Sequence, residues 1–440
     1  MLAVVVSRAD RASEHIGEQL LALEAWTERD DPDTPDAEGG GTYYTTDDVE
    51  LRTFDDLHLH LDDVADAFSD PDLLFFASRH AGDTGPLLTA HATGNFGPAE
   101  FGGTDSDLAR AAPNALAELV AVFDTHAPDD YGVGMECTHH GPSSVGCPSL
   151  FVELGSDDEQ WDDPAGAEAV ARAILDVRDA PPDRERQLVG FGGGHYVPRF
   201  ERVIRETDWA VGHVAADWCL DDMAHPRQAT DTLEQAFTAS ASEYALVDGE
   251  YPVLREVLDD LGYRVVSETW VRETSGVPLE TVERLEATLC AIDDGLRFGD
   301  PAPGFEGGIE VVDLPAELTA EATNVDPDAA LEAVASRAVA YETEENGTRP
   351  MGRAVLADTT REALVRALAA VLEAKYDDVT VEENRVVARE EAFDPEKART
   401  LGVEEGPAFG TLAAGEAVEV DGREIPPGRV RTAREVEFPR

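Results

Sequence analysis

Residues 187–196 have the sequence QLVGFGGGHY. An apolar run ends there in three consecutive glycines, and Pro198 follows just before an amphipathic segment. This order predicts a strand, a tight turn and then a helix, because glycine permits a sharp turn and proline suits the first turn of a helix. The stretch is therefore one strand–helix unit of a larger fold.

The same alternation continues on both sides of this stretch. Apolar runs typical of strands lie at 2–6, 73–77, 87–91, 131–136, 150–154, 187–191, 209–213, 244–247 and 263–266. Amphipathic windows typical of helices lie at 13–23, 107–126, 166–177, 227–240 and 252–261. The pattern predicts an α/β fold with a mixed or parallel sheet flanked by helices. In such sheets, ligands bind beyond the carboxyl ends of the strands.

A segment rich in glycine and proline, 300–308, predicts a linker between two domains. We expect a catalytic domain at 1–299 and a smaller α+β C-terminal extension at 309–440. Within the extension, the pattern predicts two helices, at 326–340 and 360–374. The extension contains no histidine and no cysteine, so any imidazole or thiolate chemistry belongs to the first domain. Residues 27–41 are rich in Asp, Gly and Pro and predict a surface insertion.

The chain is strongly acidic, with 92 Asp and Glu residues against 34 Lys and Arg residues and a formal net charge of −58. Self-repulsion of this size destabilises a compact protein in dilute buffer, but at molar salt the Debye length falls to about 3 Å. We interpret the acidity as adaptation to a halophilic cytosol and not as the mark of a partner. Because 42% of the residues are hydrophobic, the composition excludes a disordered acidic protein.

The sequence carries no sign of export or membrane insertion. No apolar stretch approaches the roughly 18 residues that cross a bilayer. Residues 1–7 lack a basic segment and predict a first strand in place of a signal peptide. Four cysteines in a chain of this length argue against a disulfide framework. We expect a cytoplasmic monomer with no membrane partner.

All eleven histidines lie in the first 225 residues, and three groups of them follow predicted strands. The groups are ECTHHGP at 136–142, GFGGGHY at 190–196, and SRH at 78–80 with His91 after the next strand. Because ligand sites form where strands end, we expect these side chains to share one cleft. We interpret four other histidines as structural, namely His15, His58, His60 and His126.

Imidazoles and a carboxylate in these groups predict a catalytic zinc site. Adjacent residues in a strand point to opposite faces, but the turn after residue 136 lets two histidines converge. We expect Zn²⁺ to be held by His80, His91, His139 and His140. Bound zinc lowers the pKa of water to about 7, and Glu136, His140 and His195 are the candidate catalytic residues, with Glu136 or His195 moving the proton. A Cys137 nucleophile beside His139 is an open alternative, and His213 with Asp217 forms a weaker candidate pair.

Substrate contacts are expected around the glycine turn. Gly193 and Gly194 would present backbone amides to a developing oxyanion, with Tyr196 beside them. No lysine directly follows the turn, and the first in the chain is Lys375, which excludes a Walker phosphate-binding loop. Arg79 and Arg199 are candidates for binding a substrate carboxylate or phosphate.

Arginines gather in two places, and on so acidic a chain both are candidate tracks for an RNA backbone. The two clusters are Arg184, Arg186, Arg199, Arg202 and Arg205, and Arg423, Arg429, Arg431, Arg434 and Arg440. The alternative for the first cluster is ion pairing on a solvated helix with Glu201 and Glu206. High salt weakens electrostatic contacts, so shape and stacking would have to supply more of the affinity.

Taken together, these segments resemble the archaeal and plant type of D-aminoacyl-tRNA deacylase. The resemblance covers about residues 1–299 and rests on VVVS with Ala12-Ser13, SRH at 78–80, TAHATGN at 89–95, ECTHHGP at 136–142, GGGHY at 192–196 and DGLRF at 294–298. It implies hydrolysis of the ester between a D-amino acid and tRNA, zinc as cofactor, and a fold of the phosphorylase/peptidyl-tRNA-hydrolase class. The segment 401–425 is similar to part of the tRNA 3′-processing nucleases, which would suit an extension that contacts tRNA.

Two other functions remain open from the residues alone. One is a metal-dependent peptidase or a nucleoside-processing hydrolase on a similar fold. The other is a non-catalytic tRNA-binding protein whose histidines are structural, which would bind RNA without turnover.

Overall fold

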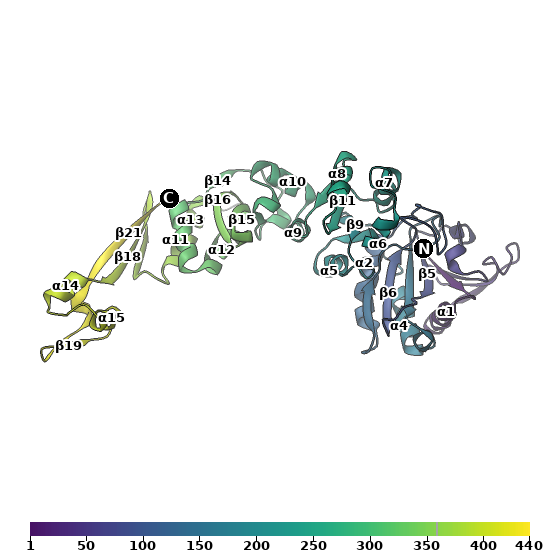
Figure 1. The fold of residues 1–440 in the computed structure, drawn as a ribbon, viewed down its shortest axis with the longest axis horizontal. Helices are drawn as coiled ribbons and strands as arrows, with labels where there is room; N and C mark the ends of the chain where they lie inside the picture. Colours follow the sequence, from purple (N-terminus) through teal and green to yellow (C-terminus); the bar gives the residue numbers. More distant parts are fainter. Residues whose placement is uncertain (358–359) are drawn as a thin grey trace. The chain divides into compact units, whose positions relative to one another are not determined.

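A computed structural model describes residues 1–357 and 360–440. The chain forms two compact units, Met1–Ser275 and Gly276–Arg440, which Figure 1 shows in sequence colours. Strand β13 (Leu296–Phe298) pairs with β15 (Ala338–Glu344), so the second unit begins before the linker predicted at 300–308. That stretch lies within the second unit.

The larger sheet of the first unit has eight strands. Their order is β2 (Thr27–Asp31), β3 (Gly41–Thr45), β4 (Val49–Phe54), β1 (Leu2–Ser7), β5 (Leu73–Arg79), β8 (Ser149–Gly155), β6 (Leu87–Ala92) and β7 (Gly132–Met135). Strand β1 is parallel to β4 and β5, and β5 is parallel to β8. Strand β6 runs antiparallel to β8 and parallel to β7. The predicted surface insertion at 27–41 supplies β2, which pairs with β3 at the sheet edge.

A second sheet in this unit is entirely parallel. Its order is β10 (Ala210–Ala215), β9 (Gln187–Gly192), β11 (Tyr244–Asp248) and β12 (Arg264–Val266). The predicted α/β class is confirmed. The division into two sheets was not predicted, because hydrophobic periodicity identifies a strand but not its hydrogen-bonded neighbour.

Helices of the first unit begin at recognisable residues. The Asp10 carboxylate accepts hydrogen bonds from the amides of Ala12 and Ser13 and caps α1 (Arg11–Leu23). Proline occupies the first turn of α2 (Pro113–His126), α4 (Pro164–Asp176), α5 (Pro198–Glu206) and α8 (Pro252–Asp260). The helix predicted at 107–126 therefore starts later, at its proline. The remaining helices are α3 (Asp158–Trp161), α6 (Asp217–Asp222), α7 (Thr230–Ala239) and α9 (Glu268–Glu273).

The second unit combines helices with antiparallel sheets. One sheet has the order β13, β15, β16 (Arg349–Leu356), β14 (Val311–Asp313), and its helices are α10 (Leu279–Thr288), α11 (Ala316–Val325), α12 (Pro327–Ala335) and α13 (Arg361–Leu372). The helix predicted at 326–340 ends at Ala335, and residues from Ala338 onward join a strand instead.

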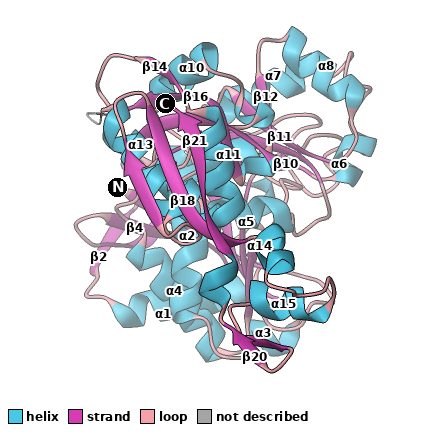
Figure 2. Cartoon of the chain, turned by 90° about the vertical axis from the view of Figure 1, so that its left-hand side faces the viewer, coloured by secondary structure: helices cyan, strands magenta, loops and turns pink. Residues whose placement is uncertain are grey.

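A long antiparallel ribbon, β18 (Arg385–Phe393) with β21 (Arg431–Pro439), is prominent in Figure 2. Strand β17 (Asp378–Val381) pairs with β18. The chain between the two ribbon strands forms α14 (Pro395–Thr400), α15 (Pro407–Ala413), β19 (Val418–Val420) and β20 (Arg423–Ile425). This small lobe has its own apolar core, which includes Leu412, Ile425 and Val430.

Within residues 1–357 and 360–440, no helix has both the length and the apolar character that a membrane crossing requires.

Candidate active site

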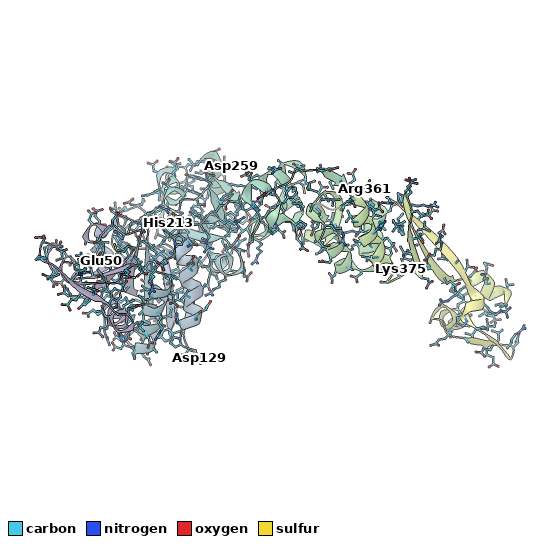
Figure 3. The ribbon with its side chains drawn as sticks, turned by 180° about the vertical axis from the view of Figure 1, so that it is seen from behind. Glu50, Asp129, His213, Asp259, Arg361 and Lys375 are labelled. Atoms are coloured by element: carbon cyan, nitrogen blue, oxygen red, sulfur yellow. The ribbon has the colours of Figure 1, made fainter. Side chains whose placement is uncertain are left out.

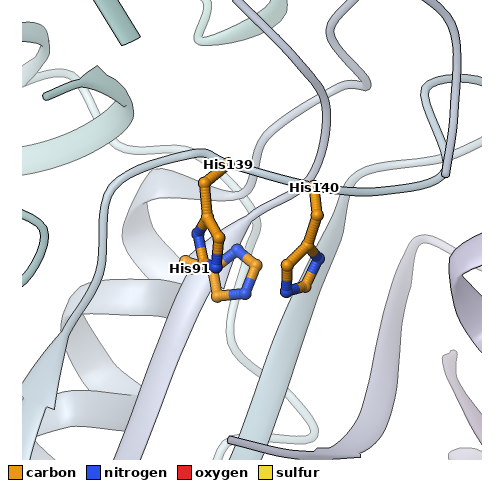
Figure 4. A group of neighbouring side chains, drawn as sticks. All are labelled: His91, His139 and His140. Carbon is orange, nitrogen blue, oxygen red and sulfur yellow. The ribbon is translucent and has the colours of Figure 1, made fainter. Parts of the chain in front are cut away.

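Five histidines from separate segments meet in the first unit. His80 follows β5, His91 lies in β6, His139 and His140 lie in the turn after β7, and His195 follows β9. The ring centroids of His139 and His140 are 4.2 Å apart, and each lies 4.6 Å from the ring of His91. Figure 4 shows these three rings converging. His195 joins them, with its ring 4.6 Å from that of His139.

The carboxylate of Glu153, in β8, also belongs to this cluster. Because β6 is antiparallel to β5 and β8, His80 and His91 approach from opposite directions along the sheet, and Glu153 lies between them. Its two carboxylate oxygens are each 3.7 Å from a histidine nitrogen, Oε2 from His80 Nδ1 and Oε1 from His91 Nε2. Glu153 is not among the residues predicted from the sequence, although it is a lone acidic residue inside the buried apolar run SLFVELG.

Glu136 contacts two of the histidines, one through a hydrogen bond and one through an ion pair. His195 Nε2 is 2.6 Å from Glu136 Oε2, and His80 Nδ1 is 3.2 Å from Glu136 Oε1. The other ring nitrogen of His80 is 3.2 Å from the hydroxyl of Tyr196. A continuous polar chain therefore runs from Tyr196 through His80 and Glu136 to His195.

The two buried carboxylates are held in the ionised form. Burial would raise the pKa of Glu136, but hydrogen bonds from His195 and His80 hold that pKa well below its ordinary value. Burial also opposes ionisation of Glu153, but its interactions with the nearby His80 and His91 lower its pKa. Burial alone would lower the pKa of His80, but its interactions with Glu136 and Glu153 outweigh this effect and raise the pKa to about 10.

The paired histidines of the turn are held neutral. Burial, with the neighbouring imidazoles, lowers the pKa of His139 to about 4 and lowers the pKa of His140 well below its ordinary value. Neutral imidazoles beside ionised carboxylates form the donor set that a divalent metal ion requires.

The cluster fits a metal ion by two further observations. Ligand atoms lie within 4.8 Å of one another in three groups, which are His91, His139 and His140, then Cys137, His139 and His195, and finally His80, Glu136 and Glu153. His91 Nε2, His140 Nδ1 and Glu153 Oε1 are buried and lack a hydrogen-bond partner among the described residues. Buried polar atoms without partners are costly, and metal binding would satisfy them.

A cavity of about 390 Å³ opens beside the cluster, a size that suits a small ligand. The four cluster histidines His80, His139, His140 and His195 line it, as do Glu136 and Glu153. Arg79 also lines this cavity, and its guanidinium lies 5.2 Å from the ring centre of Trp161. Apolar walls come from Leu57, Leu59 and Phe101.

Two of the expected substrate contacts, Gly193 and Arg199, are engaged with other groups of the protein. The amide of Gly193 donates to Asp217 Oδ1 at 2.7 Å, so it is already engaged, whereas a side chain at Gly194 would meet open space. Arg199 bonds with Asp248 at 2.9 Å and with Glu268 at 3.0 Å and does not line the cavity.

His213 lies in the interior of the unit, where Figure 3 labels it, with Nε2 2.8 Å from the Ala109 carbonyl and Nδ1 3.1 Å from the Thr138 hydroxyl. These two bonds, and the absence of His213 from the cavity wall, indicate a structural role.

Cys137 is buried beside the cluster, with Sγ 3.7 Å from His195 Nδ1. A hydrogen bond with the Cys219 thiol and burial raise the pKa of the Cys137 thiol. The reactive thiolate form is therefore disfavoured, which argues against Cys137 as a nucleophile.

An α/β fold with neutral imidazoles and ionised carboxylates around a cavity has the features of a hydrolytic enzyme of the metal-binding kind. Residues 67–266 match the sequence profile of a family described as D-aminoacyl-tRNA deacylase. A D-aminoacyl-tRNA deacylase of Natronomonas pharaonis is 59% identical over 440 residues, which cover the whole of both chains. The chain belongs to the D-aminoacyl-tRNA deacylase family.

Other relatives extend the comparison. A D-aminoacyl-tRNA deacylase of Haloarcula marismortui is 53% identical over 99% of each chain, and one of Methanoregula boonei is 34% identical over 84% of this chain and 85% of the relative. The crystal structure of a conserved protein of unknown function superposes with a TM-score of 0.56 and 28% identity, covering 62% of this chain and 98% of that one.

Proposed function

We propose that the histidine–carboxylate cluster is a zinc-assisted hydrolytic centre that cleaves the ester between a D-amino acid and tRNA. The observation that carries this proposal is the convergence of five histidines with two ionised carboxylates in one cluster. Four of these histidines, His80, His139, His140 and His195, line the adjoining cavity. Membership of the family supports the reaction, and we assign that reaction to the cavity beside the cluster.

Zinc is the metal that the donor set favours. Its catalytic sites combine histidine nitrogens with carboxylate oxygens and leave a position open for water. His91, His139 and His140 would hold the ion, with Glu153 as the neighbouring carboxylate. When bound, zinc supplies a Lewis acid and acidifies water near neutral pH.

The other polar side chains would orient groups and move protons. Glu136 is hydrogen-bonded to His195 and forms an ion pair with His80, so it orients both rings towards the cavity. His195 lines the cavity and is suited to pass a proton to the leaving ribose oxygen. His80, whose raised pKa keeps it cationic at neutral pH, would stabilise negative charge that develops on the ester oxygen.

The cavity wall suits an aminoacyl group. Its apolar side, from Leu57 and Leu59, can receive the side chain of the amino acid, while Arg79 adds a cation at the same wall. We place the reaction in the cytoplasm of a salt-adapted cell and expect the enzyme to act as a monomer.

The direct test compares three substrates at molar KCl. D-Tyr-tRNA should be hydrolysed, while L-Tyr-tRNA and a small peptide should survive. Cleavage of the peptide alone would show a peptidase, and tRNA binding without cleavage of either ester would show a binding protein; either outcome would overturn the proposal.

A further inference from the structure

We propose that Phe101, Tyr196 and Trp218 form a stacking surface for the unpaired nucleotides at the 3′ end of tRNA. The inference rests on the proposed function, because it assigns the site a substrate with an unpaired nucleic-acid end. It adds a mode of substrate recognition that does not depend on phosphate contacts.

The three rings are distinctive because they are exposed. In the first unit, whose residues are all described, the exposed large hydrophobic side chains are Phe101, Tyr196 and Trp218, with exposed fractions of 60%, 37% and 42%. The corresponding residues of the second unit are aliphatic, namely Val311, Met351 and Val436. Exposed aromatic rings that gather at one place mark a binding surface.

Each ring adjoins the histidine cluster. Phe101 lines the cavity that also contains His80 and His140. The ring of Tyr196 lies 4.9 Å from that of His195 at an interplanar angle of 85°. Trp218 lines a second, smaller hollow in which His139 is a neighbour. His139 lines both hollows, and Tyr196 contacts the neighbouring His195, so all three rings lie within one or two side chains of the histidine cluster.

The loop that carries Phe101 is held by hydrogen bonds. The Asn95 side-chain amide donates to the carbonyl of Gly102 at 2.9 Å, and the amide of Thr104 donates to the Ser143 hydroxyl at 3.0 Å. The carbonyl of Phe101 itself accepts a bond from the amide of Gly141 at 3.3 Å, next to the paired histidines. The ring is therefore exposed on a braced loop.

Helix α6, which carries Trp218, is anchored to the same region. The Cys219 thiol donates to the carbonyl of Thr138 at 3.7 Å. The amide of Asp217 donates to the carbonyl of Gly193 at 2.8 Å, and the Gly193 amide donates back to the Asp217 carboxylate. Because the backbone that carries each ring is held in place, binding has to order little of the chain and loses little conformational entropy.

Charge around Trp218 favours a base over a phosphate. Asp222 lines the hollow beside Trp218, and α6 also carries Asp217 and Asp221. Carboxylates repel phosphate oxygens but accept hydrogen bonds from the amino groups of bases. Stacking is indifferent to base identity and needs an unpaired strand. It also does not depend on released counterions, unlike phosphate contacts, which salt weakens.

The test measures binding of uncharged tRNA at molar KCl, so that it is independent of ester hydrolysis. Trp218→Ala and Phe101→Ala should each weaken binding of intact tRNA about 5- to 100-fold, as expected for loss of one stacked base. Trp218→Phe and Phe101→Tyr keep a ring and should recover most of the affinity. Met351→Ala, which removes an exposed apolar side chain of the second unit, is the matched control and should bind as the wild type does.

Intact tRNA is compared with tRNA that lacks its three 3′-terminal nucleotides. The wild type should bind the shortened tRNA at least as weakly as either Ala variant binds the intact molecule, because removing three nucleotides removes every proposed stack. Equal wild-type affinity for both tRNAs, or unchanged affinity in both Ala variants, would overturn the proposal. The two proposals can fail separately. If the Ala variants lose tRNA binding but the wild type does not hydrolyse D-Tyr-tRNA, the proposed function is wrong and the stacking surface is still supported.

Discussion

Glu153 is a buried anion with limited compensation from the protein. Only 2% of it is exposed, and its closest cationic neighbour, His80, is shared with Glu136. A buried charge that lacks full pairing costs several kcal/mol. A metal ion that used the Glu153 carboxylate would remove much of this cost, which gives the residue a role in the site beyond packing.

Replacing this carboxylate tests that role. Glu153→Gln preserves the shape but removes the charge, so we expect bound zinc to fall well below the wild-type content and kcat/KM for D-Tyr-tRNA to fall about 100-fold or more. Metal content is measured by elemental analysis. Glu168→Gln on the exposed side of α4 is the control, and full metal content with full turnover in Glu153→Gln would exclude the assignment.

His140 and His195 should fail in different ways. His140→Ala removes a proposed ligand and should lower both metal content and turnover, whereas His195→Ala should keep the metal and lose about 10²- to 10⁴-fold in kcat. His126→Ala, at the end of α2, is the control. Retained turnover in both site variants would refute the catalytic assignment.

At the scale of elements, Glu268 of α9 joins two helices through arginines. Its carboxylate bonds with Arg199 and Arg202 of α5 and with Arg272 of α9, while Arg205 pairs with Glu201 and Asp124. This arginine cluster is thus largely engaged in ion pairs. Arg205 pairs with Glu201 as the solvated-helix alternative predicts, but Arg199 and Arg202 pair with Glu268 of α9 and not with Glu201 or Glu206. The hydrogen bond from Arg202, with those from Arg272 and Arg199, lowers the pKa of Glu268 to about 2.

The lowered pKa makes stability depend on pH in a known direction. The folded state binds the proton of Glu268 less readily than the unfolded state, so its contribution is complete above the ordinary pKa of about 4.3 and is lost as the pH falls towards 2. Glu268→Gln should lower the free energy of unfolding by about 1 kcal/mol at pH 7, since salt and exposure screen the pairs. The difference should disappear near pH 2.

Urea unfolding at constant salt measures this effect. Glu250→Gln, an exposed residue outside the ion-pair group, is the control. A destabilisation by Glu268→Gln that stays constant from pH 7 to pH 2 would contradict the electrostatic explanation.

The sequence predicts strands more readily than their partners. Apolar runs bounded by turn residues locate β5, β6, β8 and β9. Residues 338–341, Ala-Val-Ala-Tyr, fit a helix or a strand equally well, so the predicted helix extended too far towards the C-terminus. Histidines were identifiable by their place after strands. Glu153 was not, because its partners His80 and His91 are 73 and 62 positions away (153 − 80 and 153 − 91). The engagement of the Gly193 amide was equally hidden, since it depends on where α6 packs.

At the scale of the whole molecule, the net charge of −58 opposes compaction. Positive side chains are too few to neutralise it locally, and Lys375, one of two lysines, is already paired with Glu321 at 2.6 Å. Mobile cations must therefore supply the screening.

Raising KCl from the millimolar to the molar range should raise the unfolding temperature continuously. Circular dichroism during heating measures it, and sucrose at matched osmolality is the control, since it excludes a general osmolyte effect. An unfolding temperature independent of KCl would contradict salt adaptation.

The central claim is that distant histidines and carboxylates form one metal-dependent catalytic centre. The most direct measurement is hydrolysis of D-Tyr-tRNA at molar KCl before chelation, after chelation and dialysis, and after return of zinc. We predict loss of turnover on chelation and recovery when zinc is restored to stoichiometric content. Full turnover by protein shown to be free of metal would contradict the account.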